Sequence, residues 1–153
     1  MRILVIHGPN LNLLGIREPE VYGTTRLQEI NRSLRDRAED LGVQVSDFQS
    51  NHEGDIIDRI QAAALDVPRA SGIILNPAGY THTSVAIRDA LVAVSLPTWE
   101  IHISDPSTRE KFRHVSLVRD ICVGHTVGRG SVGYLEALDG LVAYLRERES
   151  EGS

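Results

Sequence analysis

Short apolar runs alternate along the chain with segments in which apolar residues recur every three or four positions. Runs of the first kind are typical of buried strands, and segments of the second kind are typical of amphipathic helices. The pattern predicts strands at residues 3–6, 43–48, 72–75, 98–103 and 121–123, and helices at residues 27–41, 56–64, 85–94 and 134–145. Such alternation is typical of βαβ units. We therefore expect an α/β fold, a flavodoxin-like three-layer sandwich with a five-stranded parallel sheet.

Length and composition indicate a single globular unit. The chain has 153 residues, of which 41% are hydrophobic and 24% charged, and these values are ordinary for one domain with a sizeable core. We expect one domain over residues 1–148 and a polar tail, frayed, over residues 149–153.

The net charge and the cysteine content limit which binding partners and which cellular compartment we expect. The net charge of -5 argues against nucleic acid and against a membrane surface, which both attract an excess of Lys and Arg. No apolar run is long enough to span a bilayer, and the first residues enter a strand pattern rather than a signal peptide. The single cysteine, Cys122, cannot form an internal disulfide, and indicates a reducing, cytoplasmic setting.

Polar residues that are unusual for a core follow three of the predicted strands. In open α/β sheets, ligands bind beyond the carboxyl ends of the strands, so these residues should converge on one crevice. Arginine and amide groups suit an anionic substrate with hydroxyls, and histidine and tyrosine supply acid and base groups. The residues are Asn10, Arg17 and Tyr22 after the first strand, Asn76 and His82 after the third, and Glu100, His102, Ser104, Arg109 and Arg113 along and after the fourth.

The same inventory favours proton chemistry without a metal or a cofactor. The six histidines show no metal-binding spacing. The only lysine, Lys111, stands in a charged segment, which is a poor place for a Schiff-base amine. Residues 128–133 match G-x-G-x-x-G, but only one helix follows them. We interpret these glycines as a tight turn rather than a dinucleotide site.

Two pairs of residues have both a structural and a functional interpretation. Glu100 and His102 share one face of a strand, so the carboxylate could orient the imidazole or could merely hold the strand end. Tyr22 could pack before a turn or serve as a base. Free tyrosine has a pKa near ~10, so a base at this position would need a guanidinium, such as that of Arg17, to stabilise the phenolate.

Three motifs, in order, resemble those of the type II 3-dehydroquinate dehydratases, and the likeness spans almost the whole chain. The motifs are His7–Gly15 with Arg17–Gly23, Asn76–Ser84 with Arg88–Ala90, and Glu100–Ser104 with Arg109–Arg113. The resemblance implies a cofactor-free hydro-lyase of the shikimate pathway or of quinate breakdown. Its reaction would be reversible anti elimination of water from 3-dehydroquinate to 3-dehydroshikimate through an enolate.

The resemblance also implies roles for individual residues. Tyr22 would take the C2 proton, Arg17 would keep Tyr22 ionised, and Asn10 would hold a water against the enolate. His102, oriented by Glu100, would protonate the departing C1 hydroxyl. Substrate binding would involve the backbone amides of Ile103 and Ser104, the side chains of Asn76, His82 and Arg113, and Asp89 reaching into a neighbouring subunit. A lid over residues 17–22 and a homo-oligomer, a dodecamer built from trimers, are implied as well.

Some positions depart from the family pattern, and two other classes stay open. Asp105 stands where an asparagine usually follows Ser104. Its charge would repel the substrate carboxylate at a modest cost in affinity. Alternatively Asp105 simply points at a turn, since it precedes Pro106 and Ser107 with Glu110 fits a capping box. Trp99 is bulkier than usual. The chain could be a family member diverted to a related polyhydroxylated acid, or a non-catalytic flavodoxin-like module such as a receiver-like regulator.

Overall fold

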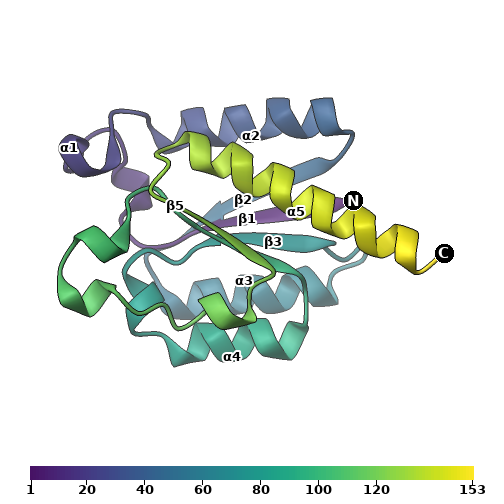
Figure 1. Ribbon diagram of the computed structural model, residues 1–153. Helices are drawn as coiled ribbons and strands as arrows, with labels where there is room; N and C mark the ends of the chain where they lie inside the picture. The colour runs from purple at the N-terminus through teal and green to yellow at the C-terminus, as the bar shows by residue number, and fades with distance from the viewer.

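A computed structural model describes all of residues 1–153 as a three-layer α/β sandwich (Figure 1). Its strands are β1 (Arg2–His7), β2 (Gln44–Gln49), β3 (Gly72–Asn76), β4 (Thr98–His102) and β5 (Gly124–Val127). All neighbouring pairs are parallel, and the order is β2-β1-β3-β4-β5. The predicted flavodoxin-like sheet is therefore confirmed.

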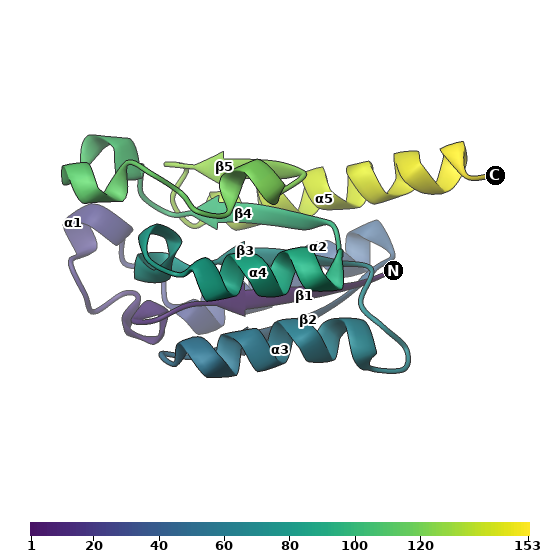
Figure 2. The same ribbon diagram turned by 90° about the horizontal axis from the view of Figure 1, so that it is seen from below.

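Two pairs of helices cover the two faces of the sheet (Figures 1 and 2). Helices α2 (Leu27–Leu41) and α5 (Val132–Glu151) lie on one face, and α3 (Glu53–Leu65) and α4 (Val85–Val94) lie on the other. Successive side chains of a strand point to opposite faces. Ile3 and Val5 therefore join the core under α2 and α5, whereas Leu4 and Ile6 join the core under α3 and α4. Burial on both faces explains why β1 is a continuous apolar run.

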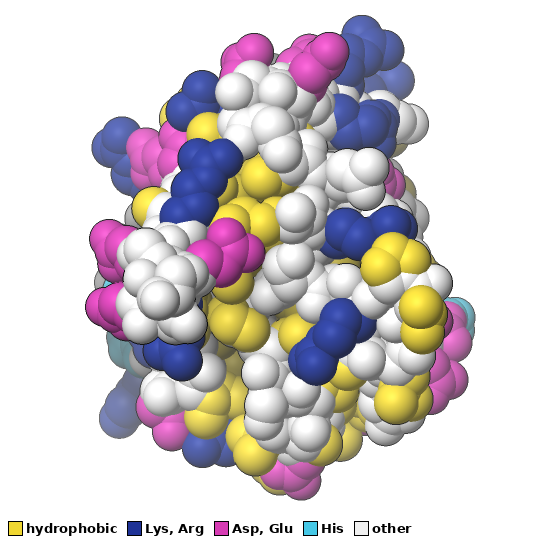
Figure 3. Space-filling model, turned by 90° about the vertical axis from the view of Figure 1, so that its right-hand side faces the viewer, with side chains coloured by type: hydrophobic (Ala, Val, Ile, Leu, Met, Phe, Trp, Pro, Cys, Tyr) yellow, Lys and Arg dark blue, Asp and Glu magenta, His cyan; other side chains and the backbone are white.

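The loops that follow β1, β3 and β4 fold into short helical turns at the carboxyl ends of the strands (Figure 1). They comprise helix α1 (Pro19–Tyr22) and 3-10 turns at residues 11–13, 78–82, 106–108 and 111–113. Such short turns keep polar side chains and free backbone groups at the edge of the sheet. Figure 3 shows the opposite face, at the amino ends of the strands, where charged side chains of both signs surround hydrophobic ones.

The predicted fifth strand at residues 121–123 is wrong. Residues 119–121 form a 3-10 turn instead, and β5 begins at Gly124. Ile121 and Cys122 are apolar because they pack against the core under α3 and α4. The real strand is an edge strand with a polar sequence, so hydrophobicity did not reveal it.

The bulky side chain of Trp99 is accommodated by two glycines. A Cβ atom at Gly124 or at Gly140 would come within 2.4 Å of the Trp99 ring, so only glycine fits beside it. The Trp99 indole donates a 2.9 Å hydrogen bond to the hydroxyl of Thr126. The bulk of Trp99 therefore belongs to the contact of β4 with β5 and α5.

Helix α5 is longer than the predicted 134–145. It runs from Val132 to Glu151, and its residues from 146 onwards are exposed. Arginine and glutamate are good helix formers, so the helix continues after its apolar periodicity has ended. None of the helices combines the length and apolar composition that a membrane crossing needs.

Candidate active site

A cavity of about 170 Å³ opens at the carboxyl ends of β1, β3 and β4. The three loops predicted to converge do meet there. Among the residues that line it are nine predicted site residues: Asn10, Arg17, Tyr22, Asn76, His82, His102, Ile103, Ser104 and Arg113.

The two other predicted residues lie outside this cavity. Glu100 is fully buried next to His102. Asp89 is an exposed residue of α4 and is not part of the lining. Its predicted role in substrate binding would require a second copy of the chain and stays a prediction.

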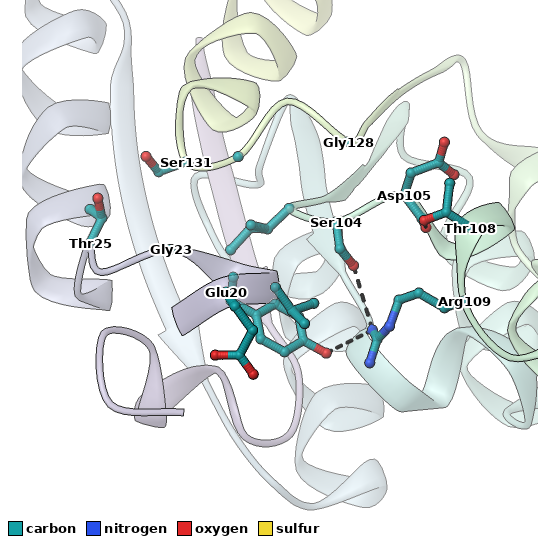
Figure 4. Close-up of a pocket in the computed structure, with 13 residues that line it drawn as sticks. Glu20, Gly23, Thr25, Ser104, Asp105, Thr108, Arg109, Gly128 and Ser131 are labelled. Atoms are coloured by element: carbon teal, nitrogen blue, oxygen red, sulfur yellow. Dashed lines mark hydrogen bonds between the residues drawn. The ribbon is translucent and has the colours of Figure 1, made fainter. Parts of the chain in front are cut away.

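A larger hollow of about 640 Å³ adjoins the first and shares Tyr22, Ile103, Ser104 and Arg109 with it (Figure 4). It extends from α1 to the loop between β5 and α5, where Gly128 and Ser131 line it. Most of the predicted acid, base and amide groups face the smaller cavity, which therefore holds the candidate chemistry.

Tyr22 stands between two arginines. Arg109 Nη1 donates a 2.8 Å hydrogen bond to the Tyr22 hydroxyl oxygen. The guanidinium carbon of Arg17 lies 4.9 Å from the centre of the Tyr22 ring, in the geometry of a cation–π contact. Sequence reasoning proposed Arg17 as the partner of the phenolate and counted Arg109 only among the arginines expected at the crevice. The structure puts Arg109 on the oxygen and Arg17 over the ring.

Arg109 carried only a weak signal in the sequence. It follows β4, as Arg113 does, and spacing does not tell which arginine turns toward the loop after β1. A charge-assisted bond from guanidinium to phenolate is about twice as strong as a neutral hydrogen bond. Arg109 is therefore the residue best placed to stabilise an ionised Tyr22.

The carboxylate of Glu100 is held by a dense set of donors. Arg119 donates to Oε1 through Nε at 2.9 Å and Nη2 at 2.6 Å, and the Ser116 hydroxyl donates to Oε2 at 2.6 Å. Burial opposes the charge, but the contacts with His102, Arg119 and Ser116 prevail and lower the pKa of Glu100 to about 2. Sequence reasoning missed Ser116 and Arg119, because both come from a loop without periodicity.

The ring of His102 lies against this carboxylate. Its Nε2 is 3.1 Å from Glu100 Oε1, but the angle is unfavourable and Nε2 has no well-directed hydrogen bond. Glu100 and His102 thus lie side by side, as their i,i+2 spacing predicted, and His102 lines the cavity.

His82 presents an acceptor rather than a charge. Its Nδ1 donates a 2.7 Å hydrogen bond to the Val115 carbonyl oxygen. Partial burial lowers the pKa of His82, which favours the neutral ring. With the proton on Nδ1, Nε2 is left as an acceptor that suits a substrate hydroxyl.

Two successive backbone amides line the cavity without partners in the chain. Neither Ile103 nor Ser104 donates its N–H to any group of the protein. The Ile103 carbonyl accepts from Gly130 N at 3.0 Å, and the His102 carbonyl accepts from Gly128 N at 3.2 Å. The G-x-G-x-x-G segment thus forms the expected tight turn, with Gly128 and Gly130 at φ of +70° and +63°, and it braces the two free amides.

The charges around the cavity favour an anion. Its lining includes Arg17, Arg109 and Arg113 but no carboxylate. Arg17 pairs with Glu18 at 3.2 Å and Arg113 with Glu110 at 2.5 Å, so the positive charge offered to an anion is chiefly that of Arg109. No group of three or more His, Cys, Asp or Glu side chains in the protein could hold a metal ion.

Asp105 serves a turn. Its Oδ1 accepts from the Ser107 backbone N–H at 2.9 Å and from the Ser107 hydroxyl at 2.7 Å. These hydrogen bonds hold the pKa of Asp105 below its ordinary value. Asp105 is also absent from the lining of the smaller cavity. The predicted repulsion of substrate gives way to the alternative, a residue that caps the 3-10 turn at 106–108.

The capping role predicts the effect of Asp105→Ala. The variant should lose about 1 kcal/mol of the free energy of unfolding, the usual value of a cap, and should keep its Michaelis constant. Urea unfolding and steady-state kinetics of both forms measure the two quantities. A Michaelis constant several times lower in the variant at low salt would restore the electrostatic interpretation.

Comparison with known proteins agrees with this geometry. Residues 1–142 match the family model described as dehydroquinase class II. The chain belongs to this family. It is 53% identical over 146 residues to the 3-dehydroquinate dehydratase of Halothermothrix orenii, which covers 95% of this chain and 97% of the relative. It is 57% identical over 136 residues to that of Bordetella avium, with coverage of 89% and 93%. The crystal structure of the type II dehydroquinase from Butyrivibrio crossotus superposes with a TM-score of 0.89 at 46% identity, covering 92% of this chain and 97% of that one.

Proposed function

We propose that this dehydroquinase-family chain removes water reversibly from 3-dehydroquinate to give 3-dehydroshikimate, by anti elimination through an enolate. One observation carries the proposal: Tyr22, bonded through its oxygen to Arg109, lines the same cavity as His102, next to the buried Glu100. A phenol bonded to a cation and an imidazole beside a carboxylate, in one small cavity, are suited to act as the base and the acid of one elimination. The names of the relatives support the substrate.

In this mechanism Tyr22 removes the C2 proton as a phenolate, which Arg109 stabilises at the oxygen and Arg17 at the ring face. Asn10 holds a water that hydrogen-bonds the developing enolate oxygen. His102, oriented by Glu100, gives its proton to the departing C1 hydroxyl. The C1 hydroxyl leaves as water with the proton from His102, the C2 proton stays on Tyr22, and the substrate becomes the conjugated enone. Transfer of that proton from Tyr22 to His102 through solvent restores both groups for the next turnover.

Binding uses the groups that are free in the cavity. The free backbone N–H groups of Ile103 and Ser104 suit the substrate carboxylate, as amides of a concave turn do for anions. His82 Nε2, the remaining Asn76 amide N–H and Arg113 suit the ring hydroxyls. The chain would work in the cytoplasm, in aromatic biosynthesis or quinate breakdown, as a dodecamer built from trimers. Asp89 is exposed on α4 and does not line this chain's cavity, as a residue that reaches a neighbouring subunit would have to be.

Addition of 3-dehydroquinate to the purified protein should produce the ultraviolet absorbance of the conjugated enone, with multiple turnovers per chain. His102→Ala is the matched control and should lose at least about a hundredfold in turnover, since general acid catalysis contributes roughly 10²–10⁴. No absorbance change from the folded wild-type protein would favour the non-catalytic module. Turnover only of a related polyhydroxylated acid would show a diverted enzyme.

A further inference from the structure

A chain of polar side chains crosses the apolar core between the sheet and helices α2 and α5. It starts on the surface at Asp47 of β2 and ends in the active-site loop at the backbone N–H of Ala78. Its interior members are Asn31 of α2, His7 of β1, Tyr134 of α5 and Asn76 of β3, and each is at most 9% exposed. No other polar chain of this length runs through the core.

Five hydrogen bonds join these groups. Asn31 Nδ2 lies 3.2 Å from Asp47 Oδ2, and Asn31 Oδ1 lies 2.8 Å from His7 Nε2. His7 Nδ1 lies 3.0 Å from the Tyr134 hydroxyl oxygen, which lies 3.0 Å from Asn76 Nδ2. Finally, Asn76 Oδ1 lies 3.1 Å from the Ala78 backbone nitrogen.

The two ends of this polar network fix the same direction for every bond, because Asp47 can only accept and the Ala78 backbone N–H can only donate. Asp47 can only accept, so Asn31 must turn its amide nitrogen toward it and its oxygen toward His7. His7 Nε2 must then carry the proton. Burial lowers the pKa of His7 to about 4, so the ring is neutral and Nδ1 is an acceptor. Burial also raises the pKa of Tyr134, so its hydroxyl keeps a proton and donates it to Nδ1, and the Tyr134 oxygen accepts from Asn76.

The last bond of the chain holds a strained turn that lines the cavity. Ala78 has a φ of +51°, in the left-handed region that alanine disfavours. Ala78 and Gly79 line the active-site cavity, as does Asn76 itself. We propose that His7 and Tyr134 are positioning residues of the active site, which hold the Asn76 amide and the Ala78 turn in the geometry that substrate binding requires. The kinetic part of this inference rests on the proposed function.

A purely structural role explains the chain less well. Buried polar networks contribute little net stability compared with apolar side chains of similar volume. A phenylalanine would fill the space of Tyr134 in a core that is otherwise made of aliphatic residues. The row of hydrogen-bonded side chains instead ends at Ala78, which lines the cavity. The effect of breaking these hydrogen bonds should therefore be measured at Ala78.

The first test needs no substrate. In Tyr134→Phe, Asn76 loses the acceptor that orients it, so the Ala78 amide should exchange with solvent at least about tenfold faster, as measured by NMR. Tyr144→Phe is the matched control, because Tyr144 lies on the same helix and its hydroxyl has no hydrogen bond in the protein. Its Ala78 exchange should equal that of the wild type.

The second test is kinetic. Tyr134→Phe should raise the Michaelis constant for 3-dehydroquinate about tenfold, or about 1.4 kcal/mol, with turnover changed less than threefold, because binding geometry is affected and the acid and base are not. A merely structural residue would lower the melting temperature and leave both constants unchanged at a temperature where the variant is folded. Tyr144→Phe should again match the wild type.

A third variant breaks the row of hydrogen-bonded side chains at its exposed end, Asp47, where a substitution does not threaten folding. Asp47→Asn replaces the charged acceptor of Asn31 Nδ2 by a neutral one and so weakens the anchoring of Asn31. It should shift Ala78 exchange and the Michaelis constant in the same sense, by about threefold. Asp139→Asn is its control, since Asp47 and Asp139 each pair with an arginine of α2, Arg35 and Arg37. The double variant Asp47→Asn with Tyr134→Phe should be no worse than Tyr134→Phe alone.

Unchanged Ala78 exchange in folded Tyr134→Phe overturns the inference, whether or not the wild type converts 3-dehydroquinate. If Tyr134→Phe does not fold, the pair Asp47→Asn and Asp139→Asn decides by the same two readouts. Inactivity of the wild type refutes the proposed function alone, because the exchange measurements still stand.

Discussion

Tyr22→Phe should lower turnover about a thousandfold or more and leave substrate affinity nearly unchanged. General base catalysis contributes roughly 10²–10⁴ to a rate, and no other group at the Tyr22 oxygen could replace the phenolate. Its hydroxyl contacts Arg109, which is a cation and cannot accept a proton. The ring itself remains, so the cation–π contact with Arg17 and the shape of the cavity persist.

Steady-state turnover, with separate titration of ligand binding, measures the two quantities. Tyr80→Phe is the matched control, because Tyr80 belongs to the loop after β3, does not line the cavity, and loses only a 2.9 Å bond to the Asn51 carbonyl oxygen. A Tyr22→Phe variant that kept more than a tenth of wild-type turnover would remove Tyr22 from the mechanism. Adding Arg109→Met to Tyr22→Phe should cost little more, since no phenolate is left to stabilise.

The sequence predicted the fold well where apolar side chains report burial. Helix α4 begins and ends at the predicted residues, and β1 and β3 extend the predicted runs by one or two residues. These elements are buried on a regular period, so local pattern and tertiary packing agree. The prediction of the fifth strand failed because β5 is a polar edge strand. The apolar residues before it belong to a turn that packs against the core under α3 and α4.

The site was predictable as a set of residues and unpredictable in its contacts. Strand ends locate Tyr22, His82 and His102 at one edge of the sheet, because parallel strands share that edge. Which arginine meets the Tyr22 oxygen depends on how loops fold around each other, and no local pattern encodes that. The same holds for the direction of the Asp105 carboxylate. The nearby Ser107 is a typical partner for an aspartate in a turn. The sequence alone does not decide between that turn role and repulsion of the substrate carboxylate.

Glu100→Gln should damage catalysis and stability together. The Ser116 oxygen already accepts from the backbone N–H groups of Val118 and Arg119, at 3.3 and 3.2 Å, so its two lone pairs are used. A glutamine would keep its oxygen on Arg119 and turn its amide nitrogen toward a hydroxyl that cannot accept a further bond. The variant leaves the buried glutamine amide unpaired and the Arg119 guanidinium without its counter-ion. Together these losses should lower the free energy of unfolding by about 3 kcal/mol.

Turnover of Glu100→Gln should fall about a hundredfold, because His102 loses the carboxylate that lies against its ring and orients it as the general acid. Glu136→Gln is the control. Glu136 forms an exposed ion pair with Arg129 at 3.0 Å, and such pairs contribute at most about 1 kcal/mol. Turnover of Glu100→Gln within threefold of the wild type would assign Glu100 to structure alone.

The pH dependence of stability separates Glu100 from other acid-sensitive groups. Its folded pKa of about 2 lies below the ordinary 4.5, so its stabilisation is complete above pH 4.5 and is lost as the pH falls toward 2. His7, with a pKa lowered from 6.5 to about 4, also destabilises the fold as the pH falls, over the window from 6.5 to 4. That loss is common to the wild type and Glu100→Gln and cancels in their difference. Urea unfolding from pH 8 to pH 3 should therefore give a constant difference down to about pH 4.5 and a shrinking one below it. A difference that already shrinks between pH 6.5 and 5 would mean that Glu100 acts on stability through the protonation of a histidine.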